Sequence, residues 1–394
     1  MKKISTLALG IALSLGLAAC STEPKTEVAA ISGIELQNFD ASVRHQDDFY
    51  YSVNGKWLAN TPIPADKSNY GAFSVLYDQS QDALKKIIDE AAAKKNPAAG
   101  SNEQKIGDFN ASFMNTDLLE TLGVTPLKPL LADIAGAKTH ADLPAVMGKL
   151  LTTGSGIPFG FYVNNDAKNS TQYAVYLSQS GLTLPDRDYY LKDDPKFAAN
   201  RQAMAKYVTD ILTEAGYKDA KRAAKNVADI EMMIAKSQWS RVESRDANKA
   251  YNKLDRAELQ KLTGQFDFNA FATSAGLGDK VTDIIVRQPS YFEKLGAGFE
   301  TFPVSAWQDY LAFHLVDSYA ELLSKNFVDL NFAFKSKTLM GIEEQQPRWK
   351  KAVDGADQVI GELVGEEYVK QYFKPEAKAR METMIKNLIK GFEV

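Results

Sequence analysis

The three histidines of this chain, with the carboxylates near them, are the side chains best suited to hold a catalytic metal ion. His45 is followed by Asp47 and Asp48, and His314 is followed by Asp317. A catalytic zinc ion takes three protein ligands and a water molecule, so one imidazole beside one carboxylate makes an incomplete site. We therefore interpret His45 as solvated or hydrogen-bonded, and His314 as a histidine at the edge of an apolar core.

A helix holds one zinc ion with two histidines when they lie four residues apart, with a glutamate between them as general base. The positions four residues after the three histidines hold Phe49, Pro144 and Ser318. None of these side chains can complete such a pair. The sequence therefore predicts no zinc-binding helix, no metal ligand and no catalytic residue within these 394 residues.

Other catalytic patterns are equally incomplete. The acidic pairs Glu343-Glu344 and Glu366-Glu367 point about 100° apart on a helix, which favours solvated charge over a shared reacting group. The run at residues 186–188 (Asp-Arg-Asp) indicates a structural ion pair or a turn. Neither a G-x-S-x-G nucleophile motif nor a glycine-rich phosphate loop occurs in the sequence.

The N-terminus has the pattern of an export signal. Two lysines precede the apolar segment 4–17, and Leu-Ala-Ala then leads into Cys20. This pattern predicts a lipoprotein signal peptide at residues 1–19, lipid attachment at Cys20 and a lipidated tether at residues 20–38. An ordinary cleaved signal with an incidental cysteine is the alternative. Ser21, rather than an aspartate, follows the cysteine, so we expect a lipid-anchored protein of the cell envelope, on the periplasmic face of the outer membrane.

Composition places the rest of the chain among ordinary globular proteins. It is 45% hydrophobic and 24% charged, with a formal net charge of −4. This balance argues against a basic surface for nucleic acid. Cys20 is the only cysteine, so no internal disulfide can form and stability must come from core burial.

The elements that must position these residues are mostly helical. Apolar side chains recur at helical spacing through much of the chain, whereas residues 157–180 contain two aromatic and β-branched runs that predict a β-hairpin. We expect a mainly α fold in which this hairpin is the main sheet content. The expected helices span residues 70–93 and 105–122, begin at Pro126, cover much of 195–247, and begin again near Ser305 and at Pro375.

A wider resemblance covers residues 39–394. Residues 47–73 combine an aromatic-rich opening, an Asn54-Gly55 turn, Trp57, paired prolines and Tyr-Gly. These segments together resemble the N-terminal portion of the neprilysin and endothelin-converting-enzyme family, zinc metalloendopeptidases that include bacterial oligopeptidase O. The further matching segments are residues 161–191, with L-P-x-R-D-Y-Y, and residues 307–310, 347–353 and 364–373.

The resemblance implies the helical lid and one wall of a chamber that selects peptides by size. In the family the zinc motif and the third ligand lie C-terminal to the last matching segment. Zinc is thus implied for the complete family enzyme, where zinc-bound water attacks the peptide carbonyl. Peptide substrates and the missing C-terminal zinc domain are the implied partners, and this chain alone is expected to be inactive.

Two residues depart from the family pattern. Members carry an arginine between serine and Tyr-Gly, understood to receive the substrate's C-terminal carboxylate, and this sequence has Asn69 there. A second arginine of that neighbourhood falls on Tyr77. An amide or a phenol cannot replace the bidentate charged contact of a guanidinium. The resemblance thus makes both residues candidates for facing the substrate. It does not imply that the complete enzyme prefers to trim C-terminal dipeptides.

Two hypotheses remain open from the sequence. In the first, the chain is the N-terminal portion of an active peptidase, because its last residues form an apolar helical stripe without a C-terminal capping glycine. In the second, it is a stand-alone, non-catalytic lipoprotein that binds peptides or a partner through an exposed half-chamber.

Overall fold

The computed structural model describes residues 33–278 and 281–393. The expected signal peptide, Cys20 and most of the tether lie outside these residues. The chain divides after Pro62 into two compact units. In the first unit, α1 (Phe49–Asn60) begins where the Asp48 carboxylate accepts a hydrogen bond from the Tyr51 amide at 2.9 Å.

The predicted turn at Asn54-Gly55 is wrong, because both residues lie inside α1. A Cβ atom at Gly55 would lie 2.7 Å from the Cβ of Asp40. The glycine is therefore explained by the close approach of the preceding segment to the helix, not by a turn conformation.

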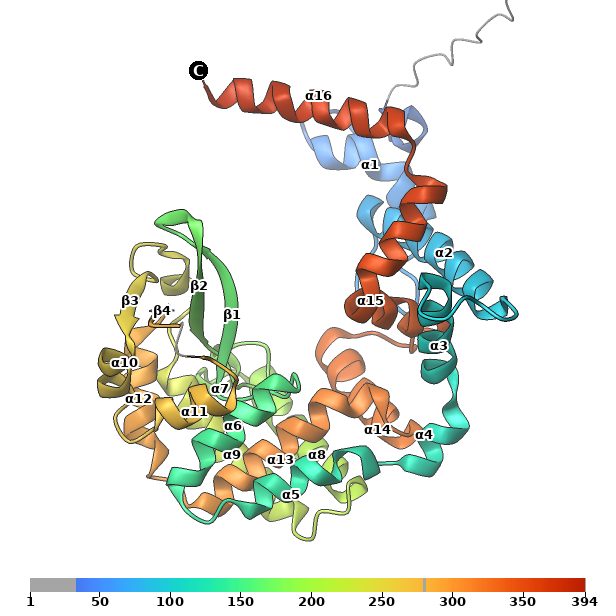
Figure 1. The fold of residues 1–394 in the computed structure, drawn as a ribbon. Coiled ribbons are helices and arrows are strands. Elements are labelled where there is room, and N and C mark those ends of the chain that lie inside the picture. Colours follow the sequence, from blue (N-terminus) through green and yellow to red (C-terminus); the bar gives the residue numbers. More distant parts are fainter. Residues whose placement is uncertain (1–32, 279–280, 394) are drawn as a thin grey trace, which may run out of the picture. The chain divides into compact units, whose positions relative to one another are not determined.

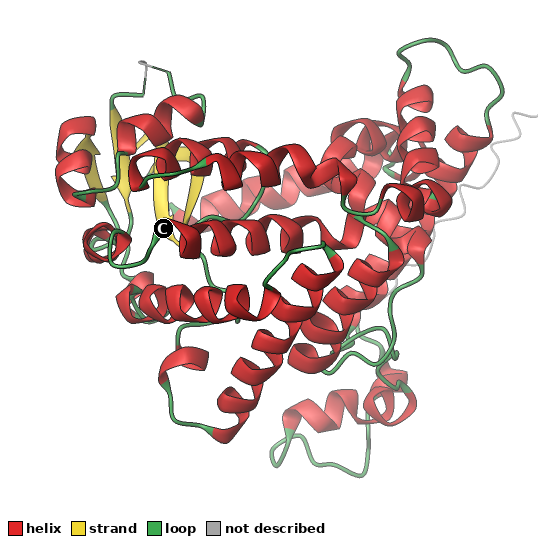
Figure 2. Ribbon diagram, turned by 90° about the horizontal axis from the view of Figure 1, so that it is seen from below, coloured by secondary structure: helices red, strands yellow, loops and turns green. Residues whose placement is uncertain are grey.

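The second unit is built mainly from helices (Figures 1 and 2). A seven-residue π-helix at Phe332–Thr338 continues α14 directly. The α-helices are α2 (Ala72–Ala93), α3 (Asn102–Met114), α4 (Thr116–Leu122), α5 (Lys128–Gly136), α6 (Leu143–Thr152), α7 (Asp188–Leu191), α8 (Pro195–Glu214), α9 (Ala220–Ser237), α10 (Arg256–Thr263), α11 (Phe268–Ser274), α12 (Pro289–Phe299), α13 (Val304–Tyr319), α14 (Lys325–Asn331), α15 (Arg348–Tyr372) and α16 (Pro375–Phe392).

The mainly helical fold class and the hairpin are confirmed. The hairpin strands β1 (Phe159–Asp166) and β2 (Asn169–Gln179) are antiparallel, with Tyr162 opposite Tyr176. The sequence analysis missed two short strands, β3 (Asn252–Asp255) and β4 (Asp283–Val286). They extend the sheet to the order β1-β2-β4-β3, with β4 parallel to β2.

Most predicted helix boundaries lie close to the observed ones, and the exceptions have local causes. The helix predicted over residues 105–122 is divided at Asn115, whose side chain accepts a hydrogen bond from the Leu118 amide at 3.1 Å and caps α4. The helix expected at Pro126 begins instead at Lys128, after a 3₁₀ turn. The helix expected from Pro375 is confirmed as α16.

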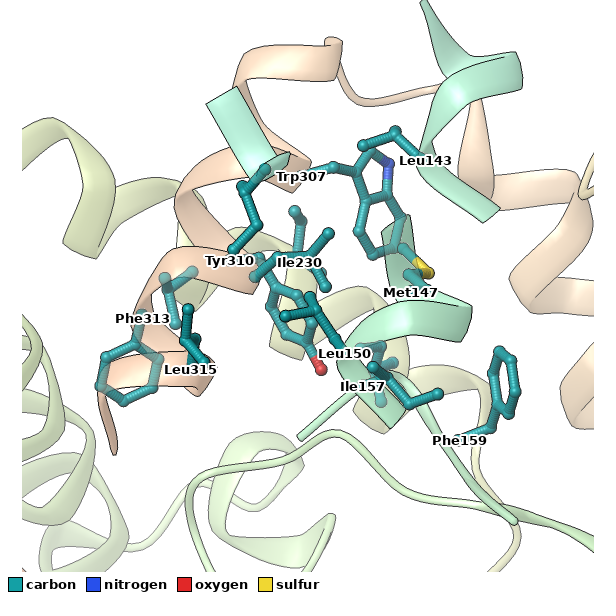
Figure 3. Close-up of a cluster of buried hydrophobic side chains, with 14 of the residues drawn as sticks. Leu143, Met147, Leu150, Ile157, Phe159, Ile230, Trp307, Tyr310, Phe313 and Leu315 are labelled. Carbon is teal, nitrogen blue, oxygen red and sulfur yellow. The ribbon is translucent and has the colours of Figure 1, made fainter. Parts of the chain in front are cut away.

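A large hydrophobic core surrounds α13 (Figure 3). Trp307 is fully buried there, and its indole nitrogen donates to the Phe299 carbonyl at 2.8 Å. Side chains on several faces of α13 are buried, among them Leu311, Phe313 and Val316. α13 is therefore a central helix, whereas Leu322 lies beyond its end and is half exposed.

A second, smaller core lies between α2, α3 and α15. Its six buried members are Ile88, Ala91, Ile106, Val353, Ala356 and Val364. Within the described residues, no helix combines the length and hydrophobicity that a membrane span requires.

Candidate functional site

The two sequence-predicted site residues lie on either side of the start of α2. Asn69 is exposed, and its amide nitrogen donates to the Ser68 hydroxyl at 3.3 Å. Tyr77 lies on the second turn of α2 and faces α15, where its hydroxyl donates to the Asp354 carboxylate at 2.5 Å. Asn69 and Tyr77 therefore make their hydrogen bonds to different partners.

Gln81, one turn after Tyr77, completes this contact between the helices. Its side chain is almost fully buried, and its amide nitrogen donates to the Tyr77 hydroxyl at 2.7 Å and to the Asp354 carboxylate. Burial raises the pKa of Tyr77 to about 12, and the hydrogen bond and negative charge of Asp354 act in the same direction. Tyr77 therefore stays neutral at physiological pH and acts as a hydrogen-bond donor, not as a base.

A compact ion-pair network adjoins this contact. Lys67 donates to Asp78 at 2.8 Å and lies over the Tyr77 ring, 5.6 Å from its centroid. Lys350 lies between Asp66 at 3.7 Å and Asp78 at 3.5 Å. Burial acts to raise the pKa of Asp78, but the hydrogen bond and charge of Lys67, with the charge of Lys350, hold that pKa below its ordinary value.

A cavity of about 620 Å³ opens beside this network. Asp66 and Asp354 belong to its wall, so the contact made by Tyr77 reaches the cavity through Asp354. The opposite wall is formed by the end of α13 and by the π-helix, which contribute Asp317 and Lys335. This cavity and the Tyr77 contact together form the candidate site.

The three histidines are engaged elsewhere. The His45 Nδ1 atom lies 2.9 Å from the Ser52 hydroxyl, and the His140 Nε2 atom lies 2.8 Å from the Phe302 carbonyl. His314 is buried, and its Nε2 atom lies 3.1 Å from a Glu231 oxygen. The described residues contain no cluster of three histidine, cysteine or acidic side chains that could hold a metal ion, so they do not fit a zinc centre.

Glu231 is a buried charged residue that the sequence analysis missed. One of its oxygens accepts from the Thr183 hydroxyl at 2.6 Å and lies beside His314, while the other accepts from the Thr183 amide at 3.0 Å and from the Tyr190 hydroxyl. Tyr190 belongs to the large core and His314 is buried, whereas Thr183 is half-buried. The network is structural, because it satisfies a buried carboxylate and reaches no cavity described here.

Two of the acidic runs have the structural roles that the sequence indicated. Asp186 pairs with Arg241 at 2.6 Å, and Arg187 donates to the Gln238 carbonyl. Glu366 pairs with Lys370 at 2.9 Å on the surface of α15. Asp186, Arg187 and Glu366 do not line the cavity of the candidate site, whereas Glu344 of the third run is exposed and does line it.

The arrangement of the candidate site suits binding, not bond breaking. Its side chains are held by hydrogen bonds and ion pairs, and no nucleophile lies beside a general base. Gln81, four residues after Tyr77, could have been found from helical spacing. Asp354 could not, since 277 residues separate it from Tyr77.

Comparisons with known proteins agree with this architecture. Residues 45–394 match the family described as peptidase family M13. An endothelin-converting enzyme homolog of Locusta migratoria is 28% identical over 389 residues, which are 93% of this chain and 52% of that protein. Neprilysin-3 of Drosophila melanogaster is also 28% identical, over 91% of this chain and 48% of its own length. The chain thus spans about half the length of these relatives.

Solved structures show the same correspondence. The Mycobacterium tuberculosis zinc metalloprotease ZMP1, in complex with an inhibitor, superposes with a TM-score of 0.85 at 34% identity, covering 91% of this chain and 54% of its own. The fold is also shared with PEPO from Lactobacillus rhamnosis, at a TM-score of 0.77 and 23% identity. From residue 45 to residue 394, this chain belongs to peptidase family M13 and corresponds to the N-terminal domain of that family.

Proposed function

We propose that this chain forms the helical substrate-chamber portion of a zinc endopeptidase that hydrolyses oligopeptides. The observation that carries the proposal is the likeness to the zinc metalloprotease ZMP1 of Mycobacterium tuberculosis, of which the chain covers only 54%. The H-E-x-x-H motif does not occur in the 394 residues. The zinc ligands and the catalytic glutamate therefore belong to a further portion, and the residues described here shape the space in which a peptide is held.

An exposed apolar face on α16 supports the proposal that a separate portion binds the zinc. Ile385, Leu388 and Phe392 share the face, and Phe392 is 84% exposed. No residue of α16 is buried among the described residues. A helix that exposes a continuous apolar stripe gains little from tertiary packing, so a second surface must cover it. We assign this face to contact with the zinc-binding portion.

The candidate site favours internal cleavage over the trimming of C-terminal dipeptides. Asn69 carries no charge, and Tyr77 presents its hydroxyl to the Asp354 carboxylate. A substrate carboxylate at this position would be repelled by the Asp354 carboxylate. An arginine guanidinium at the same position would attract it. Peptides that extend past this point do not meet that repulsion.

The anchor is a separate part of the proposal. Lipidation of Cys20 would hold the chamber at the membrane surface, because a diacylated cysteine with an added acyl chain provides enough buried hydrocarbon for stable anchoring. We place the protein in the cell envelope, on the periplasmic face of the outer membrane. Mass spectrometry of the purified membrane fraction tests this directly, since a lipid-modified Cys20 supports the anchor and an unmodified cysteine in a cleaved soluble product contradicts it.

The DNA sequence that follows codon 394 tests the proposal that this chain is part of a zinc endopeptidase. An open reading frame that continues past codon 394 into H-E-x-x-H and E-x-x-x-D supports it, and the encoded protein is expected to cleave peptides of about ten residues in a chelator-sensitive manner. Residues 21–394 alone are expected to show neither zinc binding nor cleavage. Stoichiometric zinc with chelator-sensitive activity in residues 21–394 would contradict the assignment.

A stand-alone, partner-binding lipoprotein is the second candidate function. The exposed apolar face of α16 also favours it, since that face could receive a different protein chain. A stop codon directly after codon 394, with no separately encoded zinc portion that binds α16, would favour this candidate over the peptidase.

A further inference from the structure

The cavity beside Tyr77 has one wall of unusual backbone geometry. The π-helix Phe332–Thr338 contributes Phe332, Lys335 and Ser336 to the lining. Such wide turns are rare and frequently occur at functional sites, because they move side chains off the ordinary helical positions. Here the wide turn brings Lys335 to Asp317 of α13, at 2.8 Å.

Both lysines of the cavity are already neutralised. Lys335 pairs with Asp317, whose other oxygen accepts from the Tyr207 hydroxyl at 2.6 Å. Lys351 pairs with Glu321 at 3.6 Å. Neither lysine is therefore a free site for an anion.

Two carboxylates of the cavity have no cationic partner among the described residues. Asp354 receives hydrogen bonds only from the neutral groups of Tyr77 and Gln81. Glu344 is exposed, and no ion pair of the described residues includes it. A third carboxylate of the lining, Asp66, is paired with Lys350. The lining therefore keeps an excess of negative charge that a cationic ligand would balance.

The cavity suits an organic cation better than a metal ion. Its acidic groups do not form a cluster of three metal-binding side chains within the described residues. Apolar side chains also line the cavity, among them Phe113, Leu322 and Ile342. The alkyl stem of a lysine or arginine packs on such surfaces while its charged end reaches a carboxylate. The volume of about 620 Å³ falls within the range of roughly 300–1,000 Å³ that is typical of ligand pockets.

We infer that this cavity binds a basic side chain of a peptide, with Asp354 and Glu344 as the groups that recognise its charge. The inference rests on the proposed function, which supplies the peptide, and it adds a preference for lysine or arginine on the part of the substrate that lies beside Tyr77. The neutral Tyr77 and Gln81 donors hold the Asp354 carboxylate at the wall and leave its charge uncompensated.

Binding to residues 21–394 tests the inference without cleavage. The probe is a fluorescently labelled, end-capped octapeptide of alternating alanine and lysine, and its matched control carries glutamate in place of lysine. Fluorescence anisotropy is expected to show binding of the lysine peptide only, weakening as salt is added. Asp354→Asn and Glu344→Gln are each expected to weaken it about three- to five-fold, the effect of one lost charge pair in a partly solvated site.

The control variant is Glu293→Gln, which removes an exposed carboxylate of α12 outside the cavity lining. It is expected to leave binding unchanged. Thermal unfolding checks that Asp354→Asn retains the fold. If Asp354→Asn unfolds, Glu344→Gln still decides the test, because Glu344 is exposed and its substitution should leave the fold intact. Equal binding of the two peptides, equal effects of all three variants, or wild-type affinity in both cavity variants would overturn the inference.

Free spermidine separates recognition of a peptide from recognition of charge alone. Spermidine is expected to displace the labelled octapeptide only at a much higher concentration than the unlabelled octapeptide needs, since spermidine lacks a peptide backbone and its packing. Displacement at equal concentration would overturn the assignment to peptide. The proposed function can fail separately, because cleavage by a longer protein is not measured in these binding experiments.

Discussion

The two hydrophobic cores of the second unit differ in how completely they are enclosed. The large core surrounds α13, a helix whose side chains are buried on nearly every face, and it includes a fully partnered buried carboxylate, Glu231. The small core has six buried residues from α2, α3 and α15. On the same helices, Phe73 is 89% exposed and Val359 is 69% exposed. The contrast indicates that one region is closed on itself, whereas the other presents surfaces for contact.

The polar groups follow the same division. Charged groups in the large core are satisfied internally, as Asp309 is by Tyr217, Arg222 and Asn226. Beside the small core, Asp354 is held at a cavity wall with its charge uncompensated. The large core therefore contributes most of the stability, whereas the cavity beside the small core offers the groups for ligand recognition. Function commonly resides where a rigid scaffold leaves groups incompletely satisfied.

The largest expected effect is in the enclosed core. Trp307→Ala removes a fully buried indole and its hydrogen bond to the Phe299 carbonyl. It should lower the free energy of unfolding by about 3–5 kcal/mol, measured by urea denaturation followed by circular dichroism. Trp307→Phe, which keeps an aromatic ring, serves as the control and should lose much less. A loss below about 1 kcal/mol for the alanine variant would contradict the central place of this helix.

Ile106→Ala should have a smaller effect, although Ile106 is as fully buried as Trp307. We expect a loss of about 2–3 kcal/mol, near the lower end for such substitutions, because a small core with open flanks can relax into the cavity. Hydrogen exchange sharpens the test. Faster exchange should be confined to α2, α3 and α15, and equally faster exchange around α13 would show that the two cores unfold as one.

The sequence predicted the elements that local patterns determine better than the elements that depend on tertiary contact. Local patterns sufficed for the hairpin and for α16, where turn residues and Pro375 mark the ends. They failed where tertiary contact decides the structure. Gly55 lies inside a helix, where the close approach of Asp40 explains the glycine, and β4, a strand of four residues, pairs with the distant strands β2 and β3.

The candidate site was only half visible in the sequence for the same reason. Tyr77 could be singled out by its position in the family pattern, but its partner Asp354 comes from a distant helix. Glu231 had no periodic signature, because a buried glutamate in an amphipathic helix looks like its solvated neighbours until its partners are known. The lipidation of Cys20 stays a prediction.

Tyr77→Phe should have a moderate effect that depends on pH. The variant loses one hydrogen bond to Asp354, which should lower the free energy of unfolding by about 0.5–1.5 kcal/mol at neutral pH. Folding raises the Tyr77 pKa from 10.0 to about 12. A raised pKa stabilises the folded state below pH 10, and this contribution is lost as pH rises towards about 12.

The stability difference between wild type and Tyr77→Phe should therefore shrink across that alkaline window. Denaturation curves at several pH values measure it, and Tyr173→Phe, at an exposed tyrosine of β2, is the matched control. A difference that stays constant up to pH 12, or that grows, would show that the Tyr77–Asp354 contact is not made in solution.

The smallest effect on stability should come from the open face of α16. Leu388 is 60% exposed, so Leu388→Lys should change the free energy of unfolding by less than about 0.5 kcal/mol. Asn387→Lys, at another exposed position of α16, adds the same single charge and is the control. Sedimentation should show less self-association for Leu388→Lys than for the control, because the charge interrupts the apolar stripe. A loss above about 1 kcal/mol would mean that this face is packed within the chain, and the division into a closed and an open region would then fail at α16.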